Sequence, residues 1–315
     1  MDVYPCKFEP LYKPKIWGGR NLARLFGREL PGEEPIGESW ELADIDEGTT
    51  TVANGPEAGT TLTELTRKWS DELLGGASLS EAGRFPLLLK LLDAEDTLSL
   101  QVHPDADAVR RLGGALKTEC WYVVESGGGF IYKGVREGVT AEQFRQAVES
   151  NTVDQVVRRV DVSAGDFHYL PAGTVHALGA GVVVAEVQTP SDTTFRVSDW
   201  GRGREIHVEE SLQCIHFEPT EDTAPGAAGE TLLETEYFTV ARRGDAAGAA
   251  RALPERRCAA IMLLTGEVKI RCQSGPDRLV TLKAGDTALV PAGVQGGDVV
   301  VERSARWLEI TLPES

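Results

Sequence analysis

The stretch GDFHYLPAGTVH, residues 165–176, decides the fold that this sequence predicts. Gly165 and Gly173 can adopt backbone conformations that other residues avoid, and Pro171 fixes its own φ angle, so the stretch reads as two tight turns around a short segment. Turns placed in this way project the side chain of His176 into the mouth of a β-barrel. The simpler alternative is a β-turn that carries a surface histidine.

The turn residues recur at a constant distance along the chain, which indicates two related β units. Residues 164–166 (AGD) and 171–173 (PAG) reappear 120 positions later as residues 284–286 and 291–293. The second copy has Gly296 in the place of His176, and Cys258 in the place that corresponds to Glu119. The second unit therefore keeps the turns but lacks both ligand-type side chains, and we expect it to serve as a scaffold.

Short strands rich in valine, leucine and aromatic residues, separated by glycine and proline, predict a mainly β fold of two cupin-type jelly-roll barrels or sandwiches. We expect a catalytic, metal-binding domain over residues 1–220 and a C-terminal domain without metal ligands over 230–315, joined by the acid-, Pro- and Ala-rich segment 218–229. Helical insertions are expected at about 60–80 and 104–118. Capping-box patterns predict helix starts at Thr61 and Thr140, and a third helix follows Pro104 to Leu112.

Four residues form a candidate metal site. Apolar residues alternate over 98–102, so a strand would bury them and point Gln101 and His103 together to its other face. Alone, each residue is more often structural than functional. Together with Glu119 and His176 they make a mixed nitrogen and oxygen donor set that suits zinc, accepts other divalent metals, and leaves room for water or substrate.

Composition restricts the partners of the protein. The net charge of −17 argues against a nucleic-acid surface or an anionic membrane surface. Five cysteines, odd in number and without a CxxC pair, suggest neither disulfides nor a thiolate zinc site, and favour a reducing cytoplasm. No apolar run is long enough for a membrane span, and the N-terminus lacks the order of a secretion signal. We expect a monomer or a small homo-oligomer.

From about Tyr12 to Arg202 the chain resembles the type I phosphomannose isomerases, also called mannose-6-phosphate isomerases, in their short bacterial form. The motifs that carry the resemblance are residues 16–19 (IWGG), 36–41 (IGESWE), 90–94 (KLLDA), 101–104 (QVHP), 117–119 (KTE), the His176 motif, and 191–196 (SDTTFR). The family often has Lys-Pro-Glu and Ser-Asp-Asn where this chain has KTE and SDT. Asparagine commonly follows the His176 motif where this chain has Ala180.

The resemblance implies an activity and a set of site residues. The activity is the metal-dependent interconversion of mannose 6-phosphate and fructose 6-phosphate through an enediolate. The implied zinc ligands are Gln101, His103, Glu119 and His176. The implied catalytic residues are Lys117, Asp192 and Arg196. We further expect the sugar phosphate to contact Ser39, Trp40, Lys90 and Glu186, with phosphate candidates among Ser39, Lys90, Lys117 and Arg196.

Two other functions stay open at this point. A non-catalytic sugar-binding or regulatory cupin would keep the metal site and lack the proton-transfer groups, and the presence of Lys117, Asp192 and Arg196 speaks against it. A metal-dependent cupin oxygenase is less consistent with the Gln101 ligand and the neighbouring lysine, although a fold alone does not fix the chemistry.

Overall fold

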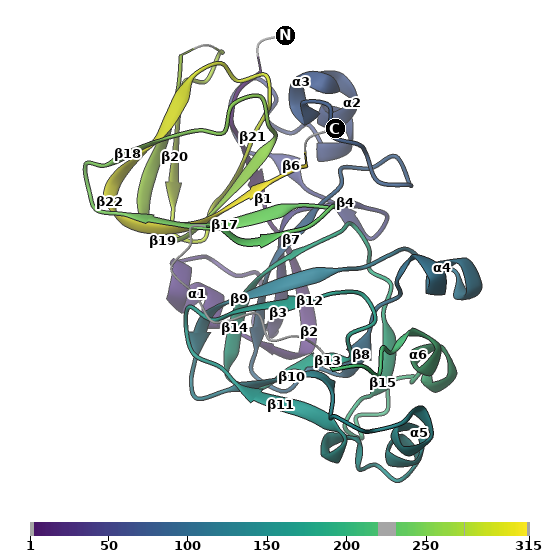
Figure 1. Cartoon of the computed structure of the whole chain (residues 1–315). Helices are drawn as coiled ribbons and strands as arrows, with labels where there is room; N and C mark the ends of the chain where they lie inside the picture. Colours follow the sequence, from purple (N-terminus) through teal and green to yellow (C-terminus); the bar gives the residue numbers. More distant parts are fainter. Residues whose placement is uncertain (1–2, 220–230, 274, 314–315) are drawn as a thin grey trace.

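The computed structural model describes residues 3–219, 231–273 and 275–313, and most of its regular structure is β-strand. The predicted linker at 218–229 lies almost entirely outside these ranges. Figure 1 shows two groups of strands, one above the other. No helix in the described ranges is both long enough and apolar enough to cross a membrane.

Two facing sheets form the larger unit. The first has the order β11-β10-β13-β8-β15 and the second β12-β9-β14-β7-β2-β3. The strands of the first are β8 (Leu100–Val102), β10 (Phe130–Val135), β11 (Val157–Asp161), β13 (His176–Leu178) and β15 (Phe195–Ser198). Those of the second are β2 (Leu11–Gly19), β3 (Ile36–Leu42), β7 (Leu88–Ala94), β9 (Glu119–Ser126), β12 (Phe167–Leu170) and β14 (Val182–Gln188). Trp121 and Val184 of one sheet pack with Ile131 and Leu178 of the other in a single buried cluster.

A third, nine-stranded sheet forms the other unit, with the order β16-β17-β22-β19-β21-β1-β6 and with β18 and β20 on its long strands β22 and β19. Its strands are β1 (Cys6–Glu9), β6 (Thr51–Val52), β16 (Thr231–Glu234), β17 (Thr239–Asp245), β18 (Ala250–Ala252), β19 (Ala259–Cys272), β20 (Leu279–Lys283), β21 (Thr287–Val290) and β22 (Gly297–Thr311). A short hairpin of β4 (Asp44–Ile45) and β5 (Gly48–Thr49) stands apart. Because β1 and β6 join this sheet, the N-terminal residues are shared between the units. The division at 220–230 stays a prediction.

The repeated turns have the same backbone hydrogen bonds in both units. Asp166 N donates to Ser163 O, and Asp286 N donates to Lys283 O. Each aspartate carboxylate also accepts from the backbone N–H three residues earlier. Gly165 and Gly285 have φ angles of 97° and 92°, a region that favours glycine. The sequence repeat is therefore a structural repeat at these turns.

The helices largely follow their predicted starts. The capping boxes at Thr61 and Thr140 are present, at α2 (Leu62–Trp69) and α5 (Ala141–Glu149). A helix over 106–112, α4 (Ala106–Leu112), follows Pro104 as predicted. The insertion expected at about 60–80 is divided into two helices, because Ser70 has a φ of 43° and α3 (Asp71–Leu74) starts after it. Two helices were not predicted, α1 (Asn21–Phe26) and α6 (Val208–Cys214).

Strand β9 has one face in each unit. Cys120 and Tyr122 belong to the large buried cluster that also contains Ile261 and Leu263 of β19, whereas Trp121 packs between the two sheets of the first unit. The C-terminal sheet thus supports the strand that carries Glu119.

Arg28 makes a second connection between the units. Its guanidinium donates two hydrogen bonds of 2.7 Å to the Glu41 carboxylate, one of 2.9 Å to Ser39 Oγ, and a further one to Gly285 O. The side chains of Arg28 and Glu41 are 11% and 3% exposed. A buried carboxylate that loses its cation is strongly destabilised.

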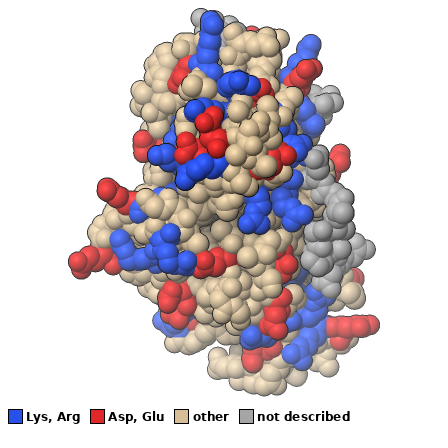
Figure 2. Space-filling model, turned by 90° about the vertical axis from the view of Figure 1, so that its left-hand side faces the viewer, with Lys and Arg blue, Asp and Glu red and all other residues tan. Residues whose placement is uncertain are grey.

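The acidic side chains behind the net negative charge do not cover the surface evenly. On the face in Figure 2, lysine and arginine side chains lie among aspartate and glutamate side chains. Attraction or repulsion of an anion therefore depends on the local cations rather than on the total charge.

We expect Arg28→Met to lower the free energy of unfolding by about 3–5 kcal/mol, because Glu41 would stay buried without its partner. Arg24→Met is the matched control, since it removes an exposed ion pair with Glu125 and should cost less than about 1 kcal/mol. Urea unfolding of both variants measures the difference. Equal, small losses would contradict the role of the buried pair.

Candidate metal centre

Three strands of the first unit bring His103, Glu119 and His176 together. His103 directly follows β8, Glu119 begins β9, and His176 begins β13. Their ligand-type atoms all lie within 4.8 Å of one another. The three residues are 2%, 0% and 1% exposed. Within the described residues, this is the one group of three such side chains close enough to share a metal ion.

The cluster contains polar atoms that the protein does not satisfy. Glu119 Oε1 lies 3.2 Å from His176 Nε2, and Glu119 Oε2 lies 3.5 Å from His103 Nε2. Among the described residues, neither Glu119 oxygen nor His103 Nε2 has a hydrogen-bond partner. Buried polar atoms are rarely left in this state, and a cation between them would satisfy all three. The donor set fits a divalent metal.

Both imidazoles are oriented by backbone carbonyls. His103 Nδ1 lies 3.0 Å from Thr193 O, and His176 Nδ1 lies 2.8 Å from Thr174 O. If each Nδ1 carries the proton and donates it, each Nε2 is left with a lone pair that faces Glu119. Such outer hydrogen bonds are typical of metal-binding histidines.

The protonation states also suit a metal. Burial, together with the nearby Lys117 cation, lowers the pKa of His103 to about 3, so its ring is neutral near pH 7. Burial by itself raises the pKa of Glu119, but the Lys117 cation and the contacts with the two imidazoles outweigh it and hold that pKa well below its usual value. A neutral imidazole and an ionised carboxylate are the forms that bind metals.

Gln101 lies beside the cluster. It is the central residue of β8 and is directly opposite His176 on β13. Its Nε2 lies 3.4 Å from His176 Nε2. A half-turn of the amide exchanges its nitrogen and oxygen, and this would present Oε1 to the same place. The predicted alternation over 98–102 is confirmed, since Leu98, Leu100 and Val102 are buried.

Lys117 is not a solvated surface lysine. It is 4% exposed, and its Nζ lies 3.1 Å from Glu119 Oε2. The structure therefore puts an ammonium group against the carboxylate of the cluster, in a place from which water is largely excluded.

A second buried group of charges adjoins the cluster. Lys90 Nζ lies 3.1 Å from Glu186 Oε1 and 3.9 Å from Glu38 Oε2. Trp121 Nε1 donates a hydrogen bond of 2.8 Å to Glu186 Oε2. The Trp121 ring also packs edge-on against the His176 ring, with the ring centers 5.4 Å apart. Trp121 thus connects the two groups. Sequence reasoning did not select Trp121 or Glu38.

The two carboxylates keep Lys90 charged. Burial lowers its pKa, but the charges of Glu186 and Glu38 outweigh burial and raise it. Burial by itself would raise the pKa of Glu38, but the cations of Lys90 and Lys15 outweigh burial and lower this pKa to about 2. These groups therefore form permanent ion pairs near pH 7.

Ser39 and Trp40 lie on opposite faces of β3. Trp40 is directly opposite Lys90, and the Lys90 ammonium lies 5.7 Å from the center of its ring. Ser39 Oγ instead contacts Glu41 at 2.6 Å and Arg28 on the other face. Consecutive residues of a strand point to opposite faces, so Ser39 and Trp40 cannot share one. Ser39 therefore lies on the face of β3 away from Lys90 and Trp40, and its contact with the substrate stays a prediction.

Arg196 and Asp192 lie at the edge of the site. Arg196 is directly opposite Gln101 in the β15–β8 register, so the two side chains share a face. Its Nη1 donates to Glu205 O over 2.6 Å, and partial burial, with the charge of Arg204, lowers its pKa. Asp192 is exposed, and its charge still contributes to the raised pKa of Lys90.

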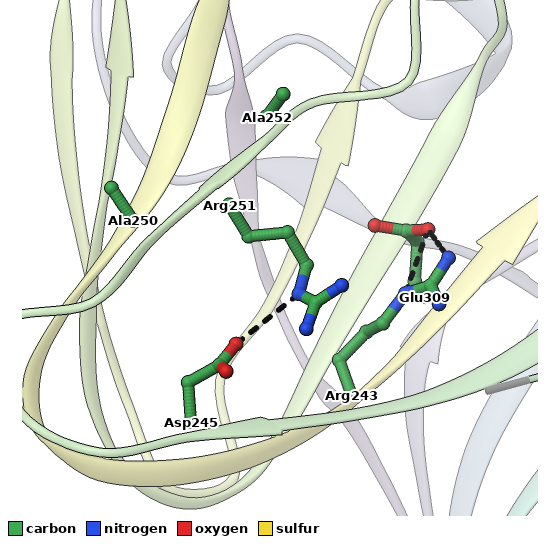
Figure 3. Close-up of a pocket in the computed structure, with 6 residues that line it drawn as sticks. All are labelled: Arg243, Asp245, Ala250, Arg251, Ala252 and Glu309. Atoms are coloured by element: carbon green, nitrogen blue, oxygen red, sulfur yellow. Dashed lines mark hydrogen bonds and ion pairs between the residues drawn. The ribbon is translucent and has the colours of Figure 1, made fainter.

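The C-terminal unit has a different pocket. Its cavity of about 500 Å³ is lined by two ion pairs, Arg243 with Glu309 at 2.7 Å and Arg251 with Asp245 at 3.2 Å. Figure 3 shows these side chains around the pocket. Residues 230–315 contain no histidine. The expectation that the second unit lacks metal ligands stays a prediction.

Comparisons with known proteins agree with this architecture. A family model described as phosphomannose isomerase type I, catalytic domain, matches residues 6–121. The mannose-6-phosphate isomerase ManA of Bacillus subtilis is 36% identical over 93% of this chain and 95% of its own length. The mannose-6-phosphate isomerase of Streptococcus mutans is 38% identical over 74% of this chain and 78% of its own length. The solved mannose 6-phosphate isomerase of Bacillus subtilis superimposes with a TM-score of 0.85 at 31% identity, covering 97% of this chain and 99% of that one. The predicted mainly β, cupin-type fold is confirmed.

We expect Glu119→Gln to bind a divalent metal more than about 100-fold more weakly, because removing a direct ligand should exceed the roughly 10–100-fold cost of removing an outer partner. Metal analysis after equilibrium dialysis measures this. Glu125→Gln, on the same strand but half-exposed and paired with Arg24, is the control and should retain the metal. Equal metal content in both variants would exclude Glu119 as a ligand.

Proposed function

Because the chain belongs to the type I phosphomannose isomerase family, we propose that it interconverts mannose 6-phosphate and fructose 6-phosphate with the help of one divalent metal ion. The observation that carries this proposal is the buried His103–Glu119–His176 cluster with its unpartnered atoms. The ammonium group of Lys117 lies next to it. Five buried cysteines present as free thiols support a cytoplasmic enzyme.

The proposed metal is zinc. The proposed ligands are Gln101, His103, Glu119 and His176. Two imidazoles with a carboxylate and an amide oxygen suit zinc, and such a mixed set leaves a position for a ligand from solution. When bound, the ion would polarise the sugar carbonyl and stabilise negative charge on its oxygen.

The reaction needs a group that removes the proton from C2 and returns it at C1. We assign this role to Lys117 in its neutral amine form, which a divalent metal bound nearby would favour: the amine would take the proton from C2, and the resulting ammonium would return it at C1. His103 is less suited to it, because its Nδ1 faces Thr193 O and its Nε2 faces Glu119. Asp192, exposed at the edge, is assigned a supporting role.

Charge on the enediolate needs stabilising groups that are fixed in advance. Arg196 shares a face with Gln101, so its cation lies at the edge of the same surface. Lys90, Glu186 and Trp40 adjoin the cluster as a rigid group of donors and acceptors. We assign these three to the sugar hydroxyl groups, because buried ion pairs keep their geometry when the substrate binds.

A coupled assay tests the function. We expect fructose 6-phosphate to form from mannose 6-phosphate, to stop when a chelator removes the metal, and to resume when zinc is added. Full turnover by protein that metal analysis shows to be metal-free would overturn the metal role, and absence of turnover in the zinc-loaded protein would overturn the activity.

Lys117→Met should retain bound metal and lose about 10²–10⁴-fold in kcat, which is the usual range for a group that transfers a proton. Lys68→Met is the control, because this lysine is exposed and paired with Glu57, and its kcat should not change. Metal content and kcat are measured on the same samples. Unchanged turnover in Lys117→Met would rule the lysine out as the proton carrier.

A further inference from the structure

The loop that follows β14, residues 189–193, holds the ring of His103 in place. The carbonyl oxygen of Thr193 lies 3.0 Å from His103 Nδ1. Because this oxygen can only accept a hydrogen bond, the ring presents Nδ1–H to it and leaves Nε2 with a lone pair toward Glu119. The position of Thr193 O therefore decides how His103 faces the cluster.

Gln188 fixes the first part of this loop from beside the cluster. It is the last residue of β14, is fully buried, and is directly opposite Glu119 on β9, so the two side chains share a face. Its Nε2 donates to Thr189 O over 2.8 Å and to Ser191 O over 2.7 Å. Only the NH₂ group can donate to two carbonyls, so these contacts determine the orientation of the amide.

The other atom of the same amide argues against a role in stability alone. Gln188 Oε1 is buried and makes no hydrogen bond within the part of the chain that the structure describes. A buried oxygen without a partner destabilises the folded state, and an apolar side chain of similar volume would avoid that cost. What an apolar side chain could not provide is the pair of hydrogen bonds to the loop.

The hydroxyl group of Ser191 fixes the rest of the loop. Ser191 is buried, and its Oγ accepts from Thr193 N over 3.1 Å and donates to Ala115 O over 3.0 Å. Ala115 N in turn donates to Thr193 Oγ1 over 3.0 Å. A single hydroxyl thus holds Thr193 and joins the loop to the segment 115–118, which carries Lys117.

Further hydrogen bonds link this segment to both of its neighbours. Thr118 N donates to Thr189 Oγ1 over 3.2 Å. Lys117 N donates over 3.2 Å to the carbonyl of Pro104, the residue next to His103. The loop, the segment and the end of β8 therefore form a closed ring of contacts, so a shift of the loop would displace His103 and Lys117 together.

We propose that Gln188 and Ser191 are positioning residues that fix the Thr193 carbonyl, and through it the ring of His103, and thereby set the affinity of the cluster for a divalent metal ion. This inference rests on the proposed function, and neither side chain is among the proposed ligands. Outer hydrogen bonds that orient a ligand typically change metal affinity by about 10–100-fold, which sets the size of the expected effect.

The test is the dissociation constant for zinc, measured by competition with a chromophoric chelator. We expect Gln188→Met and Ser191→Ala each to raise it by about 10–100-fold. Ser191→Thr keeps the hydroxyl group and should restore most of the affinity. Thr50→Val is the matched control, because Thr50 Oγ1 likewise accepts from a backbone N–H and donates to a carbonyl, both of Ala43, and belongs to none of these segments. Its zinc affinity should equal that of the wild type.

Cobalt-loaded protein gives a second measurement, because the absorption bands of bound Co²⁺ depend on the number and geometry of its ligands. We expect these bands to shift in Gln188→Met and in Ser191→Ala, and to stay unchanged in Thr50→Val. Thermal unfolding of the metal-free variants checks that each is folded. Should Gln188→Met fail to fold, Ser191→Ala, which removes one oxygen atom, decides by the same two measurements.

The outcomes separate this inference from the proposed function. Absence of turnover in the zinc-loaded wild type would overturn the proposed activity, whereas the zinc affinities of the variants would still decide the roles of Gln188 and Ser191. Unchanged affinity and unchanged cobalt bands in both folded variants would overturn the positioning role. An equal loss of zinc affinity in Thr50→Val would also overturn it, since any lost buried hydroxyl group would then have the same effect.

Discussion

The site depends on one electrostatic constraint, the fully buried carboxylate of Glu119. A charge in this position is stable only if cations or hydrogen bonds compensate it. Within the described residues, the charge that compensates it is the ammonium group of Lys117, while the two imidazole nitrogens that face the carboxylate are held in place by hydrogen bonds from their rings to backbone carbonyls. A cation bound between the three side chains would supply further compensation and would contact the buried atoms that make no hydrogen bond.

The surrounding strands keep this arrangement rigid. β9 presents Glu119 and Trp121 to the interior of the first unit, and its other face packs Cys120 and Tyr122 against the C-terminal sheet. The second unit thus supports the strand of Glu119 from behind, although the matching turns at Gly165 and Gly285 are the part of the repeat that it preserves. Arg28 adds a polar connection between Glu41 and the turn of Gly285. The C-terminal unit therefore packs against the strand that carries Glu119 and helps to hold it in place.

Charge is arranged around the cluster in separate groups. The acidic and lysine side chains near Trp121 pair with one another, so the five buried charges on Lys90, Lys117, Glu38, Glu119 and Glu186 largely cancel. The total charge of −17 therefore says little about the electrostatics of the site.

The sequence by itself determined the parts of this protein that depend on local chemistry. Turn residues at 165–176 and their repeat at 285–296, the capping boxes at Thr61 and Thr140, and the alternation over 98–102 each act over a few residues, and all are present in the structure. The same alternation would have separated Ser39 from Trp40 and grouped Glu38 with Trp40, had it been applied to 36–41.

Only the tertiary structure decided the rest. The burial of Lys117 and the link from Trp121 to Glu186 depend on strand order and register. Those are set by packing between residues distant in the chain, and no local pattern records them.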